Sequence, residues 1–477
     1  MVHRSRGKYS YPCTQGPFCS SAARLRQLQL MLQKCSQSQK HASQSQQRFF
    51  PAKSFSTYQP VIKVTPKVSL FDQEVLITVH GLTRKAKVTL QAWIQHEWRR
   101  EKVVFASYGH FVASEQGEVD LSKDSPVGGT FTGIEPMGLL WSLAPLPGHP
   151  TDIRLVWKDV TKPCDVHIAL FPGHITPSDS TVCSEDPDPR PMCVTTASRW
   201  MKAADVSRVE IKEGRLRGML FLPPGEGPHP GVIDVFGSAG GLMESRAALL
   251  ASHGFAVLSL AFFNFQDLPK TLEDVQLDYF EEAVEWFSSH PAVREGGIGT
   301  VSVSFGATFA MLTAMQCPQV KAVVQINGPP FLIMRDLQRK GQVFVKSVQL
   351  DLNLATNTKE GYITKDALLY SPSDLLPMWK SSAHMLCLVS DDDGLNNPQW
   401  IEELRTMYPE DRRHLIEVVH YPGAGHLLEP PYTPHCRACM NPAEGKHCVW
   451  GGNPKQHSEA QRDSWQRLLA FLHDKLR

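Results

Sequence analysis

Acidic residues are absent from the beginning of this 477-residue chain. No Asp or Glu precedes Asp72, whereas eleven of the 49 Lys and Arg residues lie in that stretch. The rest of the chain therefore carries 38 basic against 48 acidic side chains, although the net charge of the whole chain is +1. Sequence-independent binding of nucleic acid needs a basic surface. We therefore expect no nucleic-acid partner.

Long apolar runs are absent as well. No stretch reaches the roughly 18 to 20 apolar residues that cross a bilayer as a helix, so we expect no integral membrane segment. Hydrophobic residues nevertheless make up 42% of the chain, which is enough to bury large cores. A wholly disordered protein is therefore excluded.

Closely spaced metal ligands are scarce. Among eleven cysteines, only Cys436 and Cys439 have a tight spacing. Together with His447 and Cys448 they could supply four zinc ligands, but an adjacent His and Cys do not match the usual second pair of ligands. We therefore expect no metal and no other cofactor, and we expect the reduced thiols of an intracellular protein.

Residues 1–56 have the composition of a mitochondrial transit peptide, because they lack acid and are rich in Arg, Ser and Gln. Residues 22–33 can form a short helix with Leu25, Leu28 and Leu32 on one face. We therefore expect a location in the mitochondrial matrix. The alternative is a disordered tail that carries no targeting signal, on a protein of the cytosol.

Residues 57–195 are expected to form an all-β, immunoglobulin-like sandwich domain and a linker. Apolar and polar residues alternate at 88–94, 153–157 and 166–170, and turn signals separate these runs. Short alternating strands without a long helical pattern are typical of a β-sandwich. The Pro- and Asp-rich residues 185–191 are the predicted linker.

Residues 205–477 alternate short apolar strands with helical segments. This pattern predicts a mostly parallel sheet with helices on both faces. A long helix is expected at 271–290. Strands are expected at 231–236, 255–261, 298–303, 320–326, 384–389 and 414–419.

The sharpest motif, residues 302–306, lies between a predicted strand and a predicted helix. Acyl-transfer hydrolases place a nucleophilic serine on such a turn, with small residues two positions before and after it. Ser304 is therefore the candidate nucleophile, and Gly306 is the expected small residue after it. Ser302 takes the place of the usual first glycine but is small enough for the turn to close.

An acidic cluster and a histidine follow two later strands. Asp391–Asp393 come after the strand at 384–389, and His426 lies on a Gly-rich loop after the last strand. The order Ser, Asp, His is that of the α/β-hydrolase triad. His426 is expected to take the proton of Ser304 while a carboxylate orients the ring. Asp393 is favoured for that role, with Asp392 as the alternative.

The oxyanion of the reaction needs two hydrogen-bond donors. The backbone N–H of Phe305, directly after the nucleophile, is the first expected donor. The second is expected from the early loop that contains Ser238.

Several segments resemble the type I acyl-CoA thioesterase family, which includes bile-acid-CoA:amino-acid N-acyltransferase. The resemblance extends from about residue 60 to residue 475, and its most specific segments are 133–141, 217–224, 267–271, 279–283, 425–432 and 450–454. It implies a β-sandwich before an α/β-hydrolase domain, and acyl-CoA thioesters as substrates. It also implies a catalytic triad of Ser304, Asp393 (or Asp392) and His426.

The nucleophile favours one of the two activities that this resemblance implies. The amino-acid-transferring relatives use a cysteine at the turn, whereas an acyl enzyme on Ser304 is an oxoester that amines attack less readily. We therefore expect a serine-esterase type of hydrolase that converts acyl-CoA into free fatty acid and CoA. The alternatives are acyl transfer to glycine or taurine, and a non-catalytic acyl-CoA-binding protein whose pocket Phe305 blocks. No feature of the sequence indicates an oligomeric state.

Overall fold

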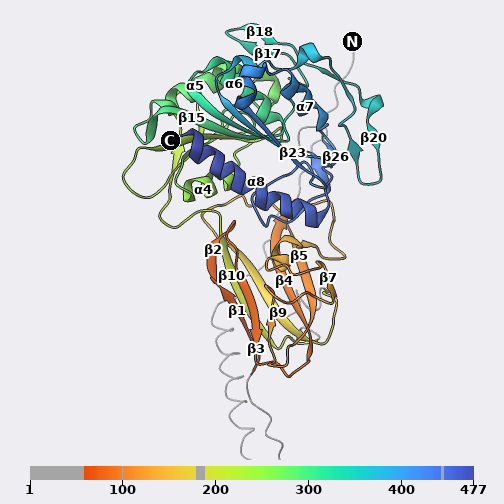
Figure 1. The fold of residues 1–477 in the computed structure, drawn as a ribbon. Coiled ribbons are helices and arrows are strands. Elements are labelled where there is room, and N and C mark those ends of the chain that lie inside the picture. Colours follow the sequence, from red (N-terminus) through yellow and green to blue (C-terminus); the bar gives the residue numbers. More distant parts are fainter. Residues whose placement is uncertain (1–58, 99, 179–188, 442–444) are drawn as a thin grey trace, which may run out of the picture. The chain divides into compact units, whose positions relative to one another are not determined.

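The computed structural model describes residues 59–98, 100–178, 189–441 and 445–477 (Figure 1). The predicted transit peptide, residues 1–56, lies outside the described residues, as does part of the predicted linker. The described residues, from 59 onward, belong to one compact unit. None of the helices in the described ranges combines the length and the apolar character of a membrane span.

The region predicted as all-β folds into two sheets. One has the strand order β1-β3-β6, and the other has the order β2-β10-β9-β4-β5-β7 with β8 beside β5. Buried residues such as Ile77, Leu90 and Ile168 line their core. The strands are β1 (Val61–Thr65), β2 (Val68–Leu70), β3 (Leu76–His80), β4 (Lys87–Trp98), β5 (Glu101–Val112), β6 (Val119–Asp120), β7 (Gly128–Gly129), β8 (Ala144–Pro145), β9 (Cys164–Pro172) and β10 (Cys193–Trp200), with the short helix α2 (Gly138–Trp141) after β7.

Two details of this region differ from the sequence-based expectation. Residues 153–157 form no strand, although Ile153 and Leu155 are buried as their alternation predicts. These side chains pack into the core without a neighbouring strand to pair with. Strand β10 pairs with β9, so the N-terminal sheet continues to Trp200, beyond the expected boundary at residue 195. The immunoglobulin-like character and the division at 195 and 205 stay predictions.

The second region contains an eight-stranded mixed sheet of the order β11-β12-β14-β13-β15-β16-β23-β24. Strands β14 to β24 run parallel, and β12 is antiparallel to both of its neighbours. The predicted α/β class is therefore confirmed. The strands are β11 (Ser207–Ile211), β12 (Arg217–Leu222), β13 (His229–Val235), β14 (Ala256–Ala261), β15 (Val293–Val303), β16 (Val320–Ile326), β23 (His384–Ser390) and β24 (Ile416–Tyr421).

Helices cover both faces of this sheet, because its strands alternate between two apolar clusters. Val323 packs in the cluster that contains residues of α5 (Leu277–Ser288), α6 (Phe305–Gln316) and α7 (Gln399–Thr406). The next residue, Val324, packs with residues of α4 (Ser245–Ser252) and α8 (Pro454–Lys475) on the other face (Figure 1). The predicted helix at 271–290 is shorter than expected, since Gln276 is extended and α5 begins only at Leu277.

Short strands and turns fill the chain between β16 and β23. They form the hairpin β17–β18, a two-stranded sheet of β19 and β22, and part of a small sheet of the order β20-β21-β26-β25. The last sheet joins this segment to a hairpin that follows β24. The strands are β17 (Leu337–Arg339), β18 (Gln342–Val345), β19 (Gln349–Leu350), β20 (Thr356–Asn357), β21 (Tyr362–Ile363), β22 (Leu368–Leu369), β25 (Ala438–Asn441) and β26 (Lys446–Val449). The same segment contains 3-10 turns at Leu352–Leu354, Pro372–Asp374 and Met378–Lys380, and two further 3-10 turns precede α5 (Leu272–Asp274) and β24 (Glu410–Leu415).

Candidate active site

Ser304 occupies a sharp turn between β15 and α6. Its φ of 55° and ψ of −135° lie in a region that residues with a side chain seldom adopt. Gly306 lets the turn close, because a Cβ at that position would collide with the backbone oxygen of Phe236. Ser302, in place of the usual glycine, is fully buried and donates its hydroxyl to the oxygen of Val324 at 3.1 Å. The buried hydroxyl that Ser302 introduces is therefore hydrogen-bonded within the sheet.

The structure brings Ser304, His426 and Asp393 into one hydrogen-bonded chain. The Nε2 atom of His426 lies 2.9 Å from Ser304 Oγ, and its Nδ1 atom lies 2.7 Å from Asp393 Oδ2. The ring and the carboxylate are only 1% and 2% exposed. The other oxygen of Asp393 accepts the backbone N–H groups of residues 395 and 396. A carboxylate held in this way fixes the imidazole so that Nε2 can accept the hydroxyl proton.

The three adjacent aspartates have different partners. Asp391 lies 2.6 Å from His420 Nδ1 near the surface. Asp392 accepts the backbone N–H of Gly452 at 2.9 Å. Asp393 alone among the three contacts the His426 ring in the described structure. The geometry therefore distinguishes the favoured carboxylate from the alternative, Asp392.

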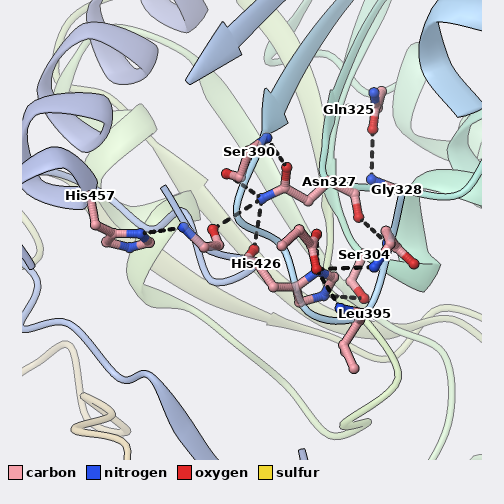
Figure 2. Close-up of polar contacts among 11 residues, drawn as sticks. Ser304, Gln325, Asn327, Gly328, Ser390, Leu395, His426 and His457 are labelled. Carbon is pink, nitrogen blue, oxygen red and sulfur yellow. Dashed lines mark hydrogen bonds and ion pairs between the residues drawn. The ribbon is translucent and has the colours of Figure 1, made fainter. Parts of the chain in front are cut away.

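Asn327, which the sequence did not single out, connects the histidine loop to the sheet (Figure 2). Its amide nitrogen donates to the backbone oxygen of His426 at 2.8 Å and to Ser390 Oγ at 2.9 Å. Its amide oxygen accepts the N–H of Ser390 at 2.7 Å. The sequence could have marked Asn327 as a site residue, because it directly follows a buried parallel strand. Functional sites of α/β folds lie at the edge of the sheet where such strands end.

His457, from α8, holds the backbone on both sides of His426. Its Nδ1 atom accepts the N–H of Gly425 at 3.0 Å, and its Nε2 atom donates to the oxygen of Leu427 at 3.0 Å. Burial lowers the pKa of His457 to about 3, so the ring is neutral and can both accept and donate. No motif in the sequence pointed to this residue.

Two cavities meet at Ser304. The larger, about 300 Å³, has Phe305 at its wall and is otherwise mainly apolar. The segment between β16 and β23 contributes Ile333, Met334, Leu350, Leu352 and Leu368 to its lining. The smaller cavity, about 200 Å³, reaches His426, Trp450 and Arg154. Phe305 therefore borders the larger cavity without filling it.

The two expected oxyanion donors lie beside this junction. Phe305 is the first residue of α6, so its N–H has no acceptor within the helix. Ser238 lines both cavities together with Ser304. The preceding Gly237 approaches so closely that a Cβ there would be 3.0 Å from the Ser304 Cβ.

The candidate zinc ligands are divided between different surroundings. Cys436, Cys439 and Cys448 belong to one apolar cluster, whereas His447 lies 3.4 Å from Asp152. In the parts of the chain that the structure describes, no three His, Cys, Asp or Glu side chains are grouped as metal ligands.

We predict that His457 makes folding sensitive to acid. Its pKa is about 3 in the folded chain but near 6.5 once unfolded, so acid favours the unfolded chain. This part of the stability is complete above about pH 6.5 and is lost as the pH falls towards 3. Between about pH 6 and 4, wild type should lose about 1.4 kcal/mol of unfolding free energy per pH unit more than His457→Gln.

Urea unfolding at a series of pH values measures this difference. The exposed His414, in the turn Glu410–Leu415, offers a control, and His414→Gln should retain nearly the wild-type slope. Equal slopes for wild type and His457→Gln would contradict the prediction.

Comparison with known proteins identifies the family. Residues 275–477 match the model described as BAAT / acyl-CoA thioester hydrolase C terminal, and residues 72–213 match the acyl-CoA thioester hydrolase/BAAT N-terminal region. Mouse bile acid-CoA:amino acid N-acyltransferase is 40% identical over 87% of this chain and 97% of its own length. Human acyl-coenzyme A thioesterase 1 is 37% identical over 85% and 94%. A solved dienelactone hydrolase from Anabaena variabilis aligns with 57% of this chain and 100% of its own, at 17% identity and a TM-score of 0.33. The chain therefore belongs to the BAAT/acyl-CoA thioester hydrolase family.

Proposed function

We propose that this protein hydrolyses acyl-CoA thioesters to free fatty acid and CoA through an acyl intermediate on Ser304. One observation carries the proposal: the hydrogen-bonded chain of Ser304, His426 and Asp393 lies at the junction of two cavities. The names of the human relatives, acyl-coenzyme A thioesterase 1 and the mitochondrial thioesterase 2, support the substrate class.

The proposed reaction begins with proton transfer from Ser304 Oγ to His426 Nε2, 2.9 Å away. The oxygen attacks the thioester carbonyl, and Asp393 stabilises the imidazolium that forms. The backbone N–H groups of Phe305 and Ser238 would hold the oxyanion. When the carbonyl re-forms, the C–S bond breaks and CoA leaves with the proton of His426. Water activated by the same histidine then releases the acid.

The cavities suggest where the two parts of the substrate bind. The larger cavity has a mainly apolar wall, so it suits the acyl chain. Its side chains come largely from the segment between β16 and β23, which we propose to be the cover of the acyl site. Phe305, at the wall of this cavity, would then influence which acyl chains fit.

Acyl transfer to an amino acid is the second candidate, because two relatives at 40% and 38% identity are named N-acyltransferases. The same acyl-Ser304 intermediate would then react with glycine or taurine instead of water. An oxoester is a poorer partner for amines than a thioester, so hydrolysis is the proposed outcome.

The deciding experiment follows CoA release by the purified full chain and identifies the acyl product, with and without glycine or taurine. We expect free acid in an amount that does not depend on the amine. Ser304→Ala should abolish both turnover and labelling by a fluorophosphonate probe. Amide product that rises with amine concentration would establish the transferase instead. A wild-type chain that neither turns over nor labels would indicate a binding protein.

A matched pair of substitutions tests which carboxylate acts. Asp393→Asn should lower kcat by about 10⁴-fold, the order seen when a triad carboxylate is replaced by its amide. Asp392→Asn should retain most activity, because an amide oxygen can still accept the N–H of Gly452. The reverse result would assign the role to Asp392.

We also propose that residues 1–56 direct the protein to the mitochondrial matrix, since they are basic and acid-free. Fused to a fluorescent protein, they should yield a signal that coincides with a matrix marker. The same segment with Arg24→Glu and Arg26→Glu should leave the fusion in the cytosol. A cytosolic signal from the unmodified segment would refute the proposal.

A further inference from the structure

Two cysteines lie beside the candidate active site. Cys439, in β25, is 7% exposed and lines the smaller cavity together with Ser304 and His426. Cys436 comes shortly before the same strand and packs in one apolar cluster with Cys439 and Trp450. A small molecule that enters this cavity therefore meets Cys439, and Cys436 packs against the same apolar cluster as Cys439.

The surroundings of Cys439 favour its thiolate. The neighbouring Cys436 thiol lowers the pKa of Cys439 in spite of burial, and the same pairing, together with burial, raises the pKa of Cys436. The indole Nε1–H of Trp450 donates to Cys439 Sγ at 3.0 Å. The positive charge of Arg154 lowers the pKa further, although the nearby Glu429 opposes it. Thiolates with such partners are the reactive thiols of proteins.

Three of the other described thiols have the opposite surroundings. Burial raises the pKa of Cys164, Cys317 and Cys387, and none of the three lines the two cavities at Ser304. An oxidant should therefore distinguish the pair at 436 and 439 from these three thiols.

Trp450 connects the pair to His426. Its ring stacks on the imidazole with a centroid separation of 5.5 Å and an interplanar angle of 22°. Its backbone oxygen accepts the N–H of His426 at 2.8 Å. One tryptophan therefore contacts both the Cys439 sulphur and the proposed catalytic base.

We propose that Cys436 and Cys439 form a dithiol that hydroperoxides oxidise to a disulfide, and that this oxidation slows acyl transfer at Ser304. The first half is independent of the proposed function. The second half rests on the proposed acyl transfer at Ser304.

The chemistry requires one hydroperoxide for each disulfide. The Cys439 thiolate attacks the terminal peroxide oxygen, so that the O–O bond breaks and a sulfenic acid and an alcohol or water form. The Cys436 sulphur then attacks the sulfenic sulphur, the S–S bond forms and water leaves. The two thiols together lose two electrons, and these electrons reduce the hydroperoxide.

The geometry gives the physical reason for slower acyl transfer. A disulfide sulphur is uncharged and is a weaker acceptor than a thiolate, so the Trp450 indole loses its charged hydrogen-bond partner. The ring that packs on His426 is then less well fixed, and the 2.9 Å contact to Ser304 depends on the position of that histidine.

The test treats the reduced full chain with hydrogen peroxide and maps the thiols by alkylation and mass spectrometry. We expect an intrachain disulfide between Cys436 and Cys439, formed before Cys164, Cys317 or Cys387 is modified and reversed by dithiothreitol. In Cys436→Ser, which lacks the resolving thiol, dimedone should trap a sulfenic acid on Cys439. Cys193→Ser, a control in β10, should form the disulfide as wild type does.

The same samples report on the active site. CoA release and fluorophosphonate labelling of Ser304 should fall several-fold on oxidation and recover on reduction, in wild type and in Cys193→Ser. A 436–439 peptide that stays reduced, without a dimedone adduct in Cys436→Ser, would overturn the proposal. A disulfide that leaves both rates unchanged would overturn its second half. If the reduced chain has no turnover at all, the proposed function fails, while the thiol mapping still decides the first half.

Discussion

The candidate site depends on the backbone of Ser304, which is held where a serine seldom lies. Its positive φ costs of the order of 1–3 kcal/mol, so the surrounding structure must enforce it. The N–H of Ser304 donates to Ile326 on the neighbouring strand, and its carbonyl accepts the N–H of Ala307 in the first turn of α6. The close approach of Gly306 to Phe236 completes the turn. This conformation aims the hydroxyl at His426 instead of into the sheet.

The parallel part of the sheet could be predicted from the sequence, because a strand buried on both faces is an uninterrupted apolar run. Residues 320–326 illustrate this, since β16 has those bounds. Strand β11 lies at one edge of the sheet, and four of its five residues are exposed, so no apolar run marks it in the sequence. The strand predicted at 153–157 is absent for another reason. A segment that buries alternate side chains without pairing to a strand has the same apolar-polar alternation as a half-buried strand.

The candidate site was predictable where it follows from chain order, and not where it follows from tertiary contacts. Ser304 and His426 each follow an apolar strand, and the C-terminal ends of parallel strands meet at one edge of the sheet. The choice among three adjacent aspartates depends on the turn that aims Asp393 at the ring. Asn327 and His457 each hold the loop around His426 through hydrogen bonds to backbone atoms far away in the sequence, and no local pattern encodes such contacts.

The position of His457 on α8 has a consequence for biosynthesis. The turn at Ser304 can form as soon as the neighbouring strands have left the ribosome, but the loop that bears His426 is clamped by a residue still farther along the chain. A nascent chain that has folded most of its sheet therefore still lacks a fixed position for the proposed general base. The proposed chemistry at Ser304 requires α8 to be docked, so the translation of α8 must precede it.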